Sequence, residues 1–260
     1  MSSRFHHASA SSLEDSDALA RAVLDRYRRL PARGKPQSTE WTVLAGIVAR
    51  TESEDIVVSL ATGNRCLGVC QLCDKGTVVN DSHAEVLARR SFKKFCLHEM
   101  LRIARGEGMA SPFFNFCKRS RVFSLKPSVT FHLYVSAPPC GDASVFPRGG
   151  SDRLILTGAK EIDAACTSGK SRGELTGSLK PPKPPCANKY SATIGVLRTK
   201  SGRSDLPDDL VTRSMSCSDK IACWHALGLQ GSLIAPFFPP GCCPLPLSSV
   251  VVSRQDTGDG

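Results

Sequence analysis

The sequence predicts an α/β protein in which helices cover the faces of a central β-sheet. Apolar runs of strand length alternate along the chain with segments of helical spacing, and short links join them. Such alternation is typical of a sheet that packs against helices. The chain has 260 residues, 41% of them hydrophobic, which is enough for one α/β domain with tails.

The first third of the chain predicts one helix followed by two strands. Residues 1–12 are polar and predict a flexible tail. Residues 13–30 carry apolar side chains at helical spacing, which indicates an amphipathic helix. Two apolar runs at 41–49 and 56–61 predict a pair of strands, with residues 51–55 as their turn.

The middle of the chain predicts a longer helix and a further strand. Asp81 or Ser82 can cap the N-terminus of the helix. Apolar and small residues at helical spacing give its expected inward face, which consists of Ala84, Leu87, Ala88, Ser91 and Phe95. Residues 130–136 alternate in polarity, are rich in aromatic side chains and predict a strand that runs into Pro139 and Cys140.

The last third predicts a short helix and a final strand. Ser216 or Ser218 can cap a helix at 219–227, and Gly228 supplies its C-terminal stop. The apolar run at 229–234 predicts another strand.

Two segments have compositions that do not favour regular structure. Residues 159–189 are rich in Lys, Gly, Ser and Pro, which predicts a mobile surface insertion. Residues 237–260 are rich in Pro and Gly and predict an irregular tail. We therefore expect one folded domain over residues 13–236.

Charge and cysteine content restrict the function classes. The net charge of +10, from 34 basic and 24 acidic side chains, favours polyanionic partners such as nucleic acid, inositol phosphates or acidic membranes. The N-terminus lacks the apolar segment of a secretory signal, and no apolar run approaches the roughly 18 residues of a membrane span. The 12 cysteines are therefore expected to be reduced, in a nuclear or cytoplasmic protein, and available as metal ligands.

The first chemical motif is a histidine two residues before a glutamate at a predicted helix start. His83 and Glu85 do not stack on one another at this spacing, yet both can reach one point beyond the helix N-terminus. This suits a metal-bound imidazole and a carboxylate beside the metal's water. Taken singly, His83 is more simply a core or capping residue, and Glu85 a carboxylate that interacts with the helix dipole.

Two cysteines complete the predicted metal site. Cys140 follows a predicted strand within Pro-Cys-Gly-Asp, and Cys217 stands at the start of the second short helix, where thiolate is favoured. A lone cysteine is usually a small buried hydrophobe, but one imidazole and two thiolates suit zinc. Catalytic zinc has three protein ligands and one open position, and zinc deaminases combine H-x-E with P-C-x-x-C. Here Ala143 replaces the second cysteine of that pattern.

These motifs, in this order, resemble the editase-type adenosine deaminases, which act on double-stranded RNA or on tRNA. The matching stretches lie between about residues 30 and 236 and are 34–36, 40–46, 80–85, 89–91, 139–142, 197–200, 214–220 and 227–233. The run around Cys217 is long and specific to this family. The short N-terminal lead resembles the branch that acts on tRNA.

The resemblance implies a fold and a reaction. The fold is a cytidine-deaminase-like three-layer sandwich with a mixed central sheet, and the reaction is hydrolysis of adenosine to inosine in RNA. For the tRNA branch the target is the adenosine immediately 3′ of the anticodon. His83, Cys140 and Cys217 would hold zinc, while Glu85 moves protons between water, the purine ring and the departing ammonia.

The resemblance also implies a buried inositol hexakisphosphate beside the zinc site. The residues that match its ligands are Asn80, Arg89, Arg90, Ser214, Lys220 and Trp224. Asp81 and Lys200 match a polar relay from this phosphate to a zinc cysteine, and Asn64 and Arg65 match a loop near the target nucleotide. Without the resemblance, Arg89 and Arg90 are more simply a solvated helix face.

The sequence departs from the family pattern in its second half. Cys223 stands where the family has arginine, and His225 where it has asparagine. Residues 237–260 contain Arg254 as their one basic residue, although residues 247–251 resemble the next family strand. We therefore expect a C-terminally truncated form with an incomplete phosphate pocket, weak inositol phosphate binding and low or absent activity.

Two other functions remain open from the sequence. A cytidine deaminase acting on a nucleotide or polynucleotide would use the same metal chemistry, but Ala143 argues against it. A non-enzymatic, zinc-stabilised RNA-binding module would need a fourth protein ligand, which Cys242 or Cys243 could supply.

Overall fold

The computed structural model describes residues 10–37, 39–107, 110–144, 197–200, 212–241 and 243–253. The insertion predicted at 159–189 lies outside these residues, as do residues 1–9 of the predicted tail. Residues 10–12 of that tail already belong to the first helix. None of the described helices combines the length and the apolar character needed to cross a membrane.

The central sheet has four strands, in the order β2 (Asp55–Thr62), β1 (Leu44–Arg50), β7 (Thr130–Val135) and β8 (Leu247–Val252). β1 pairs antiparallel with both β2 and β7, whereas β7 and β8 run parallel. The sheet is therefore mixed, as predicted. β1 and β2 form the hairpin expected from their apolar runs.

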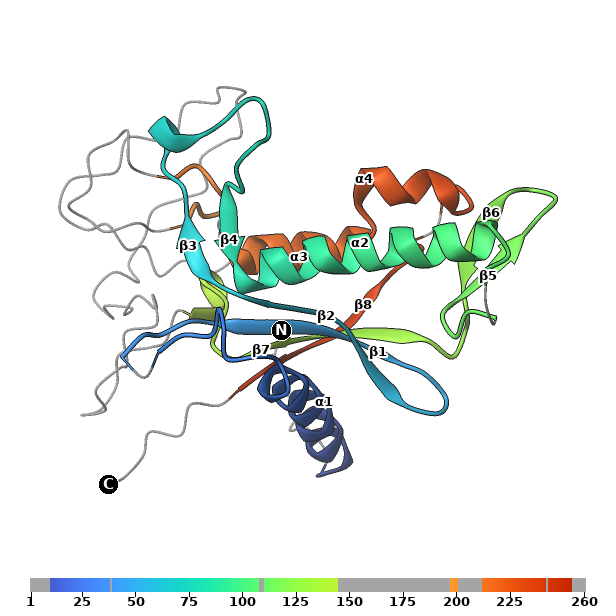
Figure 1. The fold of residues 1–260 in the computed structure, drawn as a ribbon, viewed down its shortest axis with the longest axis horizontal. Helices are drawn as coiled ribbons and strands as arrows, with labels where there is room; N and C mark the ends of the chain where they lie inside the picture. Colours follow the sequence, from blue (N-terminus) through green and yellow to red (C-terminus); the bar gives the residue numbers. More distant parts are fainter. Residues whose placement is uncertain are drawn as a thin grey trace, which may run out of the picture.

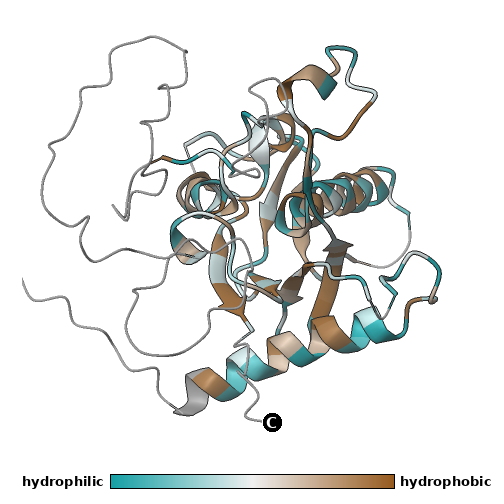
Figure 2. Ribbon diagram, turned by 90° about the vertical axis from the view of Figure 1, so that its left-hand side faces the viewer, coloured by the Kyte–Doolittle hydropathy of each residue, from teal (hydrophilic) through white to brown (hydrophobic). Residues whose placement is uncertain are grey.

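Helices cover both faces of this sheet, which confirms the predicted three-layer α/β architecture (Figure 1). α2 (Ala84–Ala104) and α3 (Cys217–Leu227) lie on one face, and α1 (Ala10–Arg28) lies on the other. Figure 2 shows α1 crossing beneath the strands, with hydrophilic and hydrophobic residues alternating along the helix. This arrangement leaves the start of α2 and the start of α3 at one end of the sheet.

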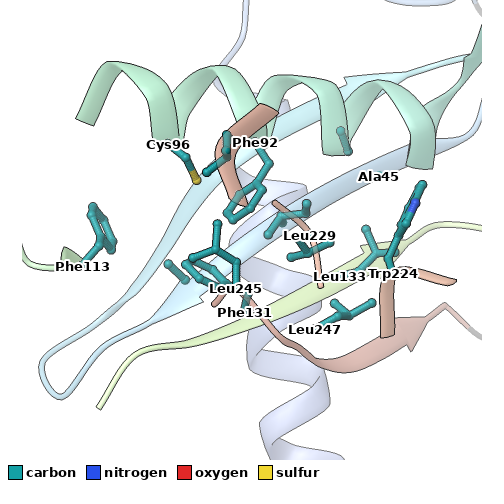
Figure 3. Close-up of a cluster of buried hydrophobic side chains, with 14 of the residues drawn as sticks. Ala45, Phe92, Cys96, Phe113, Phe131, Leu133, Trp224, Leu229, Leu245 and Leu247 are labelled. Carbon is teal, nitrogen blue, oxygen red and sulfur yellow. The ribbon is translucent and has the colours of Figure 1, made fainter. Parts of the chain in front are cut away.

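The main hydrophobic core fills the space between the sheet and α2 (Figure 3). Phe92 and Cys96 from α2 meet Phe131 and Leu133 from β7, and Trp224 joins them from α3. The rings of Phe92 and Phe131 pack edge to face with their centroids 4.9 Å apart.

The inward face of α2 differs from the predicted one. Its buried residues are Ala84, Glu85, Ala88, Phe92, Cys96 and Met100. Ser91 is exposed, and Leu87 and Phe95 are only partly buried. The predicted face is therefore wrong at Ser91, because the helix turns Phe92 rather than its neighbour toward the sheet.

A smaller core holds α1 against the other face of the sheet. Leu19 and Val23 of α1 pack there with Val48 and Tyr134. Gly46 permits this close approach, because a Cβ at that position would lie 2.9 Å from the Val23 side chain. Even the smallest side chain at Gly46 would push α1 away from β1.

Several short elements escaped prediction. β3 (Asn64–Cys66) pairs antiparallel with β4 (Asp81–His83), and β5 (Phe114–Cys117) forms a hairpin with β6 (Val122–Leu125). Single 3-10 turns occur at Val69–Gln71, Asp142–Ser144 and Ala235–Phe237.

Two predictions near the C-terminus are wrong. The run at 229–234 is a turn and a short helix, α4 (Gly231–Ile234), instead of a strand. Gly231 adopts a φ of 64°, which interrupts an extended chain, and Leu233 is 65% exposed while Ile234 is buried. Within the predicted irregular tail, residues 247–252 form β8, whose main chain pairs with β7. The irregular tail is therefore wrong at these residues, whereas the family strand to which residues 247–251 were matched is present.

Candidate metal centre

One imidazole and two sulfurs from three distant parts of the chain converge at one end of the sheet. The possible ligand atoms of His83, Cys140 and Cys217 all lie within 4.8 Å of one another. His83 Nδ1 is 3.9 Å from the sulfur of Cys140 and 3.6 Å from that of Cys217. The structure thus brings together the three residues that the sequence singled out.

His83 is the last residue of β4 and immediately precedes α2. Its backbone is extended, with φ −65° and ψ 142°, and its side chain makes no capping hydrogen bond to the helix. The His83 amide instead donates to the Asp81 carboxylate at 3.1 Å. The predicted cap by Asp81 or Ser82 is therefore wrong, because both residues belong to β4 and pair with β3.

The two cysteines are held together by main-chain hydrogen bonds. The Cys217 amide donates to the Cys140 sulfur at 3.3 Å, and the Ser218 amide donates to the Cys140 carbonyl at 2.9 Å. Ser216 caps α3 by accepting from the Asp219 amide, so of the two predicted caps Ser216 is confirmed. The N-terminus of α3 is thereby fixed on the loop that follows β7.

Gly141 makes this close approach possible. Its φ is 105°, in the left-handed region, and a Cβ there would lie 2.8 Å from the Cβ of Ser216 and 3.1 Å from that of Ser218. Glycine next to Cys140 is therefore required for the α3 N-terminus to reach the metal ligands.

Lys200 lies next to both sulfurs and is only 4% exposed. Its Nζ donates to Cys217 at 2.8 Å and to Cys140 at 3.5 Å, and it lies 3.4 Å from the Asp81 carboxylate. Burial alone would lower the pKa of Lys200, but Cys217 and Cys140 outweigh it and raise that pKa. Lys200 is therefore a buried cation paired with the two ligand sulfurs.

The two thiols titrate as a pair. A hydrogen bond from Cys217 lowers the pKa of Cys140 despite its burial, with His83 and Lys200 adding to the effect. The same hydrogen bond, together with burial, raises the pKa of Cys217. Cys140 thus ionises first, which makes it a metal-binding thiolate at neutral pH.

A buried polar network continues from Lys200 away from the sulfurs. The Asp81 carboxylate pairs with both Lys200 and Lys220, and it accepts a hydrogen bond from Ser214 at 2.9 Å. Lys220 also donates to Ser214 at 2.6 Å. Burial would raise the pKa of Asp81, but Lys220 and Lys200 keep it below its usual range.

Glu85 stands in the first turn of α2 and is only 3% exposed. Burial raises its pKa, and the negative charge of Cys140 adds to this effect, while His83 and Lys200 oppose it. A carboxyl group with a raised pKa can exchange protons nearer to neutral pH. Glu85 follows His83 by two residues, so the first turn of α2 carries it next to a ligand residue.

The donor set fits zinc. One nitrogen and two sulfurs are preferred zinc ligands, and three protein ligands leave a coordination position open in a tetrahedral site. Among the described residues no fourth histidine, cysteine or carboxylate joins this group. Cys243 does not belong to this group, and Cys242 lies outside the described residues. The described residues therefore form an open site with three protein ligands.

A second polar feature lies along α2, where basic side chains gather around Gly231. The Arg89 guanidinium stacks 5.0 Å from the Trp224 ring and donates to the Leu229 carbonyl at 3.1 Å. Burial lowers the pKa of Arg89, and burial together with the charges of Arg89 and Arg90 lowers that of Lys93. Arg89 and Trp224 also line a hollow of about 270 Å³.

These cations have the character of an anion-binding site. A Cβ on Gly231 would lie 3.3 Å from an Arg89 nitrogen and 3.8 Å from Lys93 Nζ. Within the described ranges no ion pair joins Arg89, Arg90 or Lys93 to an acidic side chain. Sequence reasoning missed Lys93, although its position four residues after Arg89 puts both on one helix face.

The remaining predicted site residues are Asn80, Arg90, Asn64 and Arg65. Asn80 and Arg90 are exposed. Asn64 pairs directly with His83 across the β3–β4 ladder, and Arg65 pairs with Ser82. The predicted substrate loop therefore borders the strand that carries the histidine.

Comparison with known proteins agrees with this geometry. A family model described as the adenosine-deaminase (editase) domain matches residues 59–259. The tRNA-specific adenosine deaminase 1 of Drosophila melanogaster is 34% identical over 222 residues, which cover 83% of this chain and 50% of that protein. The double-stranded RNA-specific adenosine deaminase of Mus musculus is 36% identical over an alignment of 216 residues that covers 76% of this chain and 16% of that protein.

The chain thus spans half, or much less, of the length of these relatives. Among solved structures, a C-terminal deletion mutant of the Rib2 deaminase of Aspergillus oryzae matches with 18% sequence identity and a TM-score of 0.21. That match covers 51% of this chain and 55% of that one. A TM-score this low supports no inference about the fold, which rests on the topology described above.

Proposed function

This chain belongs to the adenosine-deaminase (editase) family, and on that premise we propose that it uses zinc to hydrolyse adenosine to inosine in RNA. The observation that carries the proposal is the convergence of His83, Cys140 and Cys217 beside a buried glutamate. No single one of these residues would support the proposal by itself, because each residue alone could have a purely structural role.

His83, Cys140 and Cys217 would hold the zinc ion. Zinc in such a site supplies a water molecule with a pKa near 7, and hence a nucleophile at neutral pH. Lys200 compensates the charge of the two thiolates, and Asp81 with Lys220 fixes Lys200 in place. This support orients the ligands before metal or substrate binds.

Glu85 is the proposed acid and base. The reaction takes a proton from water, adds one to the purine ring and delivers one to the departing ammonia. A buried carboxyl group with a raised pKa suits all three transfers, because it is neither a very weak base nor a very strong acid near pH 7. Glu85 does not need to contact the metal to perform them.

The RNA substrate is proposed from charge and from the relatives. The net charge of +10 favours a polyanion, and the relatives are named for deamination of tRNA or double-stranded RNA. We propose tRNA, at the adenosine 3′ of the anticodon, because a loop nucleotide is already partly unstacked and costs less to extrude than one in a duplex. A nuclear or cytoplasmic location with reduced thiols follows from the same proposal.

The basic cluster around Gly231 is proposed to bind inositol hexakisphosphate. Arg89 and Lys93 face this point, and Trp224 packs on Arg89. A polyphosphate would neutralise cations that otherwise repel one another. Cys223 also lines this hollow, and the family resemblance leads us to expect arginine there, so we expect weak binding and a low rate of deamination.

The decisive experiment pairs metal analysis with an inosine assay. Zinc-loaded protein should convert adenosine in tRNA, and Glu85→Gln should slow the reaction by about 10²- to 10⁴-fold while zinc content stays unchanged. Double-stranded RNA and cytidine-containing substrates separate tRNA specificity and cytidine deamination from the main proposal. If zinc-loaded protein forms no more inosine than Glu85→Gln on either RNA, the proposed function is wrong.

A further inference from the structure

We propose that a hollow beside β3, lined by Trp41, Lys35 and Arg65, binds a nucleotide adjacent to the target adenosine. This inference rests on the proposed function, because it takes a single-stranded segment of RNA as the substrate. The neighbouring base would stack on Trp41, and its phosphate would lie against the two cations.

The hollow has the size and the lining of a ligand site. Its volume is about 590 Å³, within the range of pockets that bind small molecules. Two segments form it, residues 34–36 with 40–42, and residues 62 with 64–65. Trp41 is 54% exposed and belongs to neither hydrophobic cluster, so packing in the core does not explain this large aromatic side chain.

Hydrogen bonds fix the hollow relative to the metal group. The Asn64 side-chain amide donates to the Trp41 carbonyl at 3.3 Å. Asn64 is also the β-ladder partner of His83. Trp41 is therefore connected through one residue to the strand that carries a metal ligand, which puts the hollow one strand away from the reaction site.

The charges suit a nucleotide. Lys35 is held in place, since its Nζ donates to the Arg28 carbonyl at 3.0 Å and lies 4.9 Å from the Tyr27 ring centroid. Arg65 is exposed on β3. The acidic side chain of the hollow, Glu40, already accepts a hydrogen bond from the Gln37 amide at 2.9 Å. Proteins commonly bind single-stranded nucleic acid by stacking its bases on aromatic side chains while cations contact its phosphates.

The test measures binding of an anticodon-arm RNA hairpin, with Glu85→Gln present in every protein to prevent turnover. Trp41→Ala should weaken binding about tenfold, and Trp41→Phe should keep most of the affinity, because stacking on one aromatic side chain is worth about 5- to 150-fold. A hairpin with an abasic residue on one side of the target should also bind about tenfold more weakly.

The two losses should not multiply. If the missing base is the one that stacks on Trp41, Trp41→Ala should bind intact and abasic hairpins equally well. The proposal would be overturned if Trp41→Ala left binding unchanged. It would also be overturned if, for abasic residues on either side of the target, the loss from the missing base and the loss from Trp41→Ala multiplied. A gel-filtration profile and a melting curve identical to those of the parent protein establish that the substitution at this exposed position has not unfolded the protein.

Matched variants control for general effects. Phe237→Ala removes another exposed aromatic ring (44% exposed) and should leave binding unchanged. Arg65→Gln should weaken binding more than Arg119→Gln, which removes the same charge from the β5–β6 turn at the opposite end of the sheet (Figure 1). Equal losses for the two arginines would show a diffuse charge effect and count against the site.

The assays separate this inference from the proposed function. Inosine formation without coupling between Trp41 and a neighbouring base would overturn the proposed nucleotide site and leave the proposed deaminase function intact. Coupling without inosine formation by the unsubstituted protein would support the hollow as an RNA site and overturn the proposed catalysis.

Discussion

Lys200 is the residue on which the electrostatics of the metal centre depend. Its ammonium group is buried between two ligand sulfurs and one carboxylate, so it favours negative charge on each of these groups. A buried cation of this kind lowers the free energy of the thiolates relative to the thiols. Its contribution should therefore appear in metal affinity before it appears in catalysis.

Replacing Lys200 by methionine should weaken zinc binding at neutral pH by about 10- to 100-fold, the usual effect of losing a group that supports metal ligands. Competition with a chromophoric chelator measures this. Lys220→Met is the matched control, because Lys220 pairs with the same Asp81 and makes no hydrogen bond to either sulfur among the described contacts. Equal effects of the two substitutions would rule out a direct role of Lys200.

At this scale the sequence predicted much of the site. Its motifs identified His83, Cys140 and Cys217, which the structure gathers, and the resemblance pointed to Asp81 and Lys200 as a relay, which the structure connects. Gly141 and Lys93 were missed. The need for glycine at 141 depends on how closely α3 approaches, and periodicity along one helix does not contain that information.

A titratable side chain connects strand β8 with β7, in addition to the main-chain pairing of the two strands. His132 on β7 bridges the two strands, with Nε2 2.8 Å from Thr130 Oγ1 and Nδ1 2.8 Å from Ser249 Oγ. Burial and the charge of Arg50 lower the pKa of His132, and Asp55 and Asp15 only partly offset this. The folded protein therefore favours the neutral imidazole.

A lowered histidine pKa makes stability fall on the acid side. Below about pH 6.5 the unfolded chain takes up a proton that the folded chain resists, so unfolding becomes more favourable until the folded pKa is passed. The slope should be less than about 1.4 kcal/mol per pH unit, because at this one group the folded and unfolded states differ by less than one bound proton. His132→Gln should flatten this slope.

Urea unfolding at pH 5 and pH 7 measures the effect as a difference from the parent protein. His98→Gln, at an exposed position on α2, is the matched control and should keep the parent slope. If His132→Gln retains the full pH dependence, other groups are responsible for it.

Elements with a clear period were predictable, and elements defined by distant partners were not. α1, the β1–β2 hairpin and β7 follow from local patterns. The strand β8 has an ordinary apolar sequence in a Pro- and Gly-rich region, and it becomes a strand because β7 offers a free edge. The run at 229–234 has strand-like composition, but Gly231 and the burial of Ile234 favour a helical turn.

For the whole molecule, the distribution of charge matters more than its total. Arg89, Arg90 and Lys93 lie on one helix, and burial, together with the charges of the two arginines, lowers the pKa of Lys93. This arrangement opposes folding unless an anion relieves it. A ligand that binds only the folded state adds stability in proportion to RT ln(1 + [L]/Kd).

Inositol hexakisphosphate at about ten times its Kd should therefore stabilise the protein by about 1.4 kcal/mol, which corresponds to a rise in Tm of about 3 to 6 °C. Thermal melts over a concentration series measure both the rise and the affinity. The double variant Arg89→Gln, Lys93→Gln should abolish the rise, whereas Lys118→Gln, Arg119→Gln removes the same charge elsewhere and should retain it. A rise that survives in the first variant would place the polyanion away from α2 and rule out this basic cluster as its binding site.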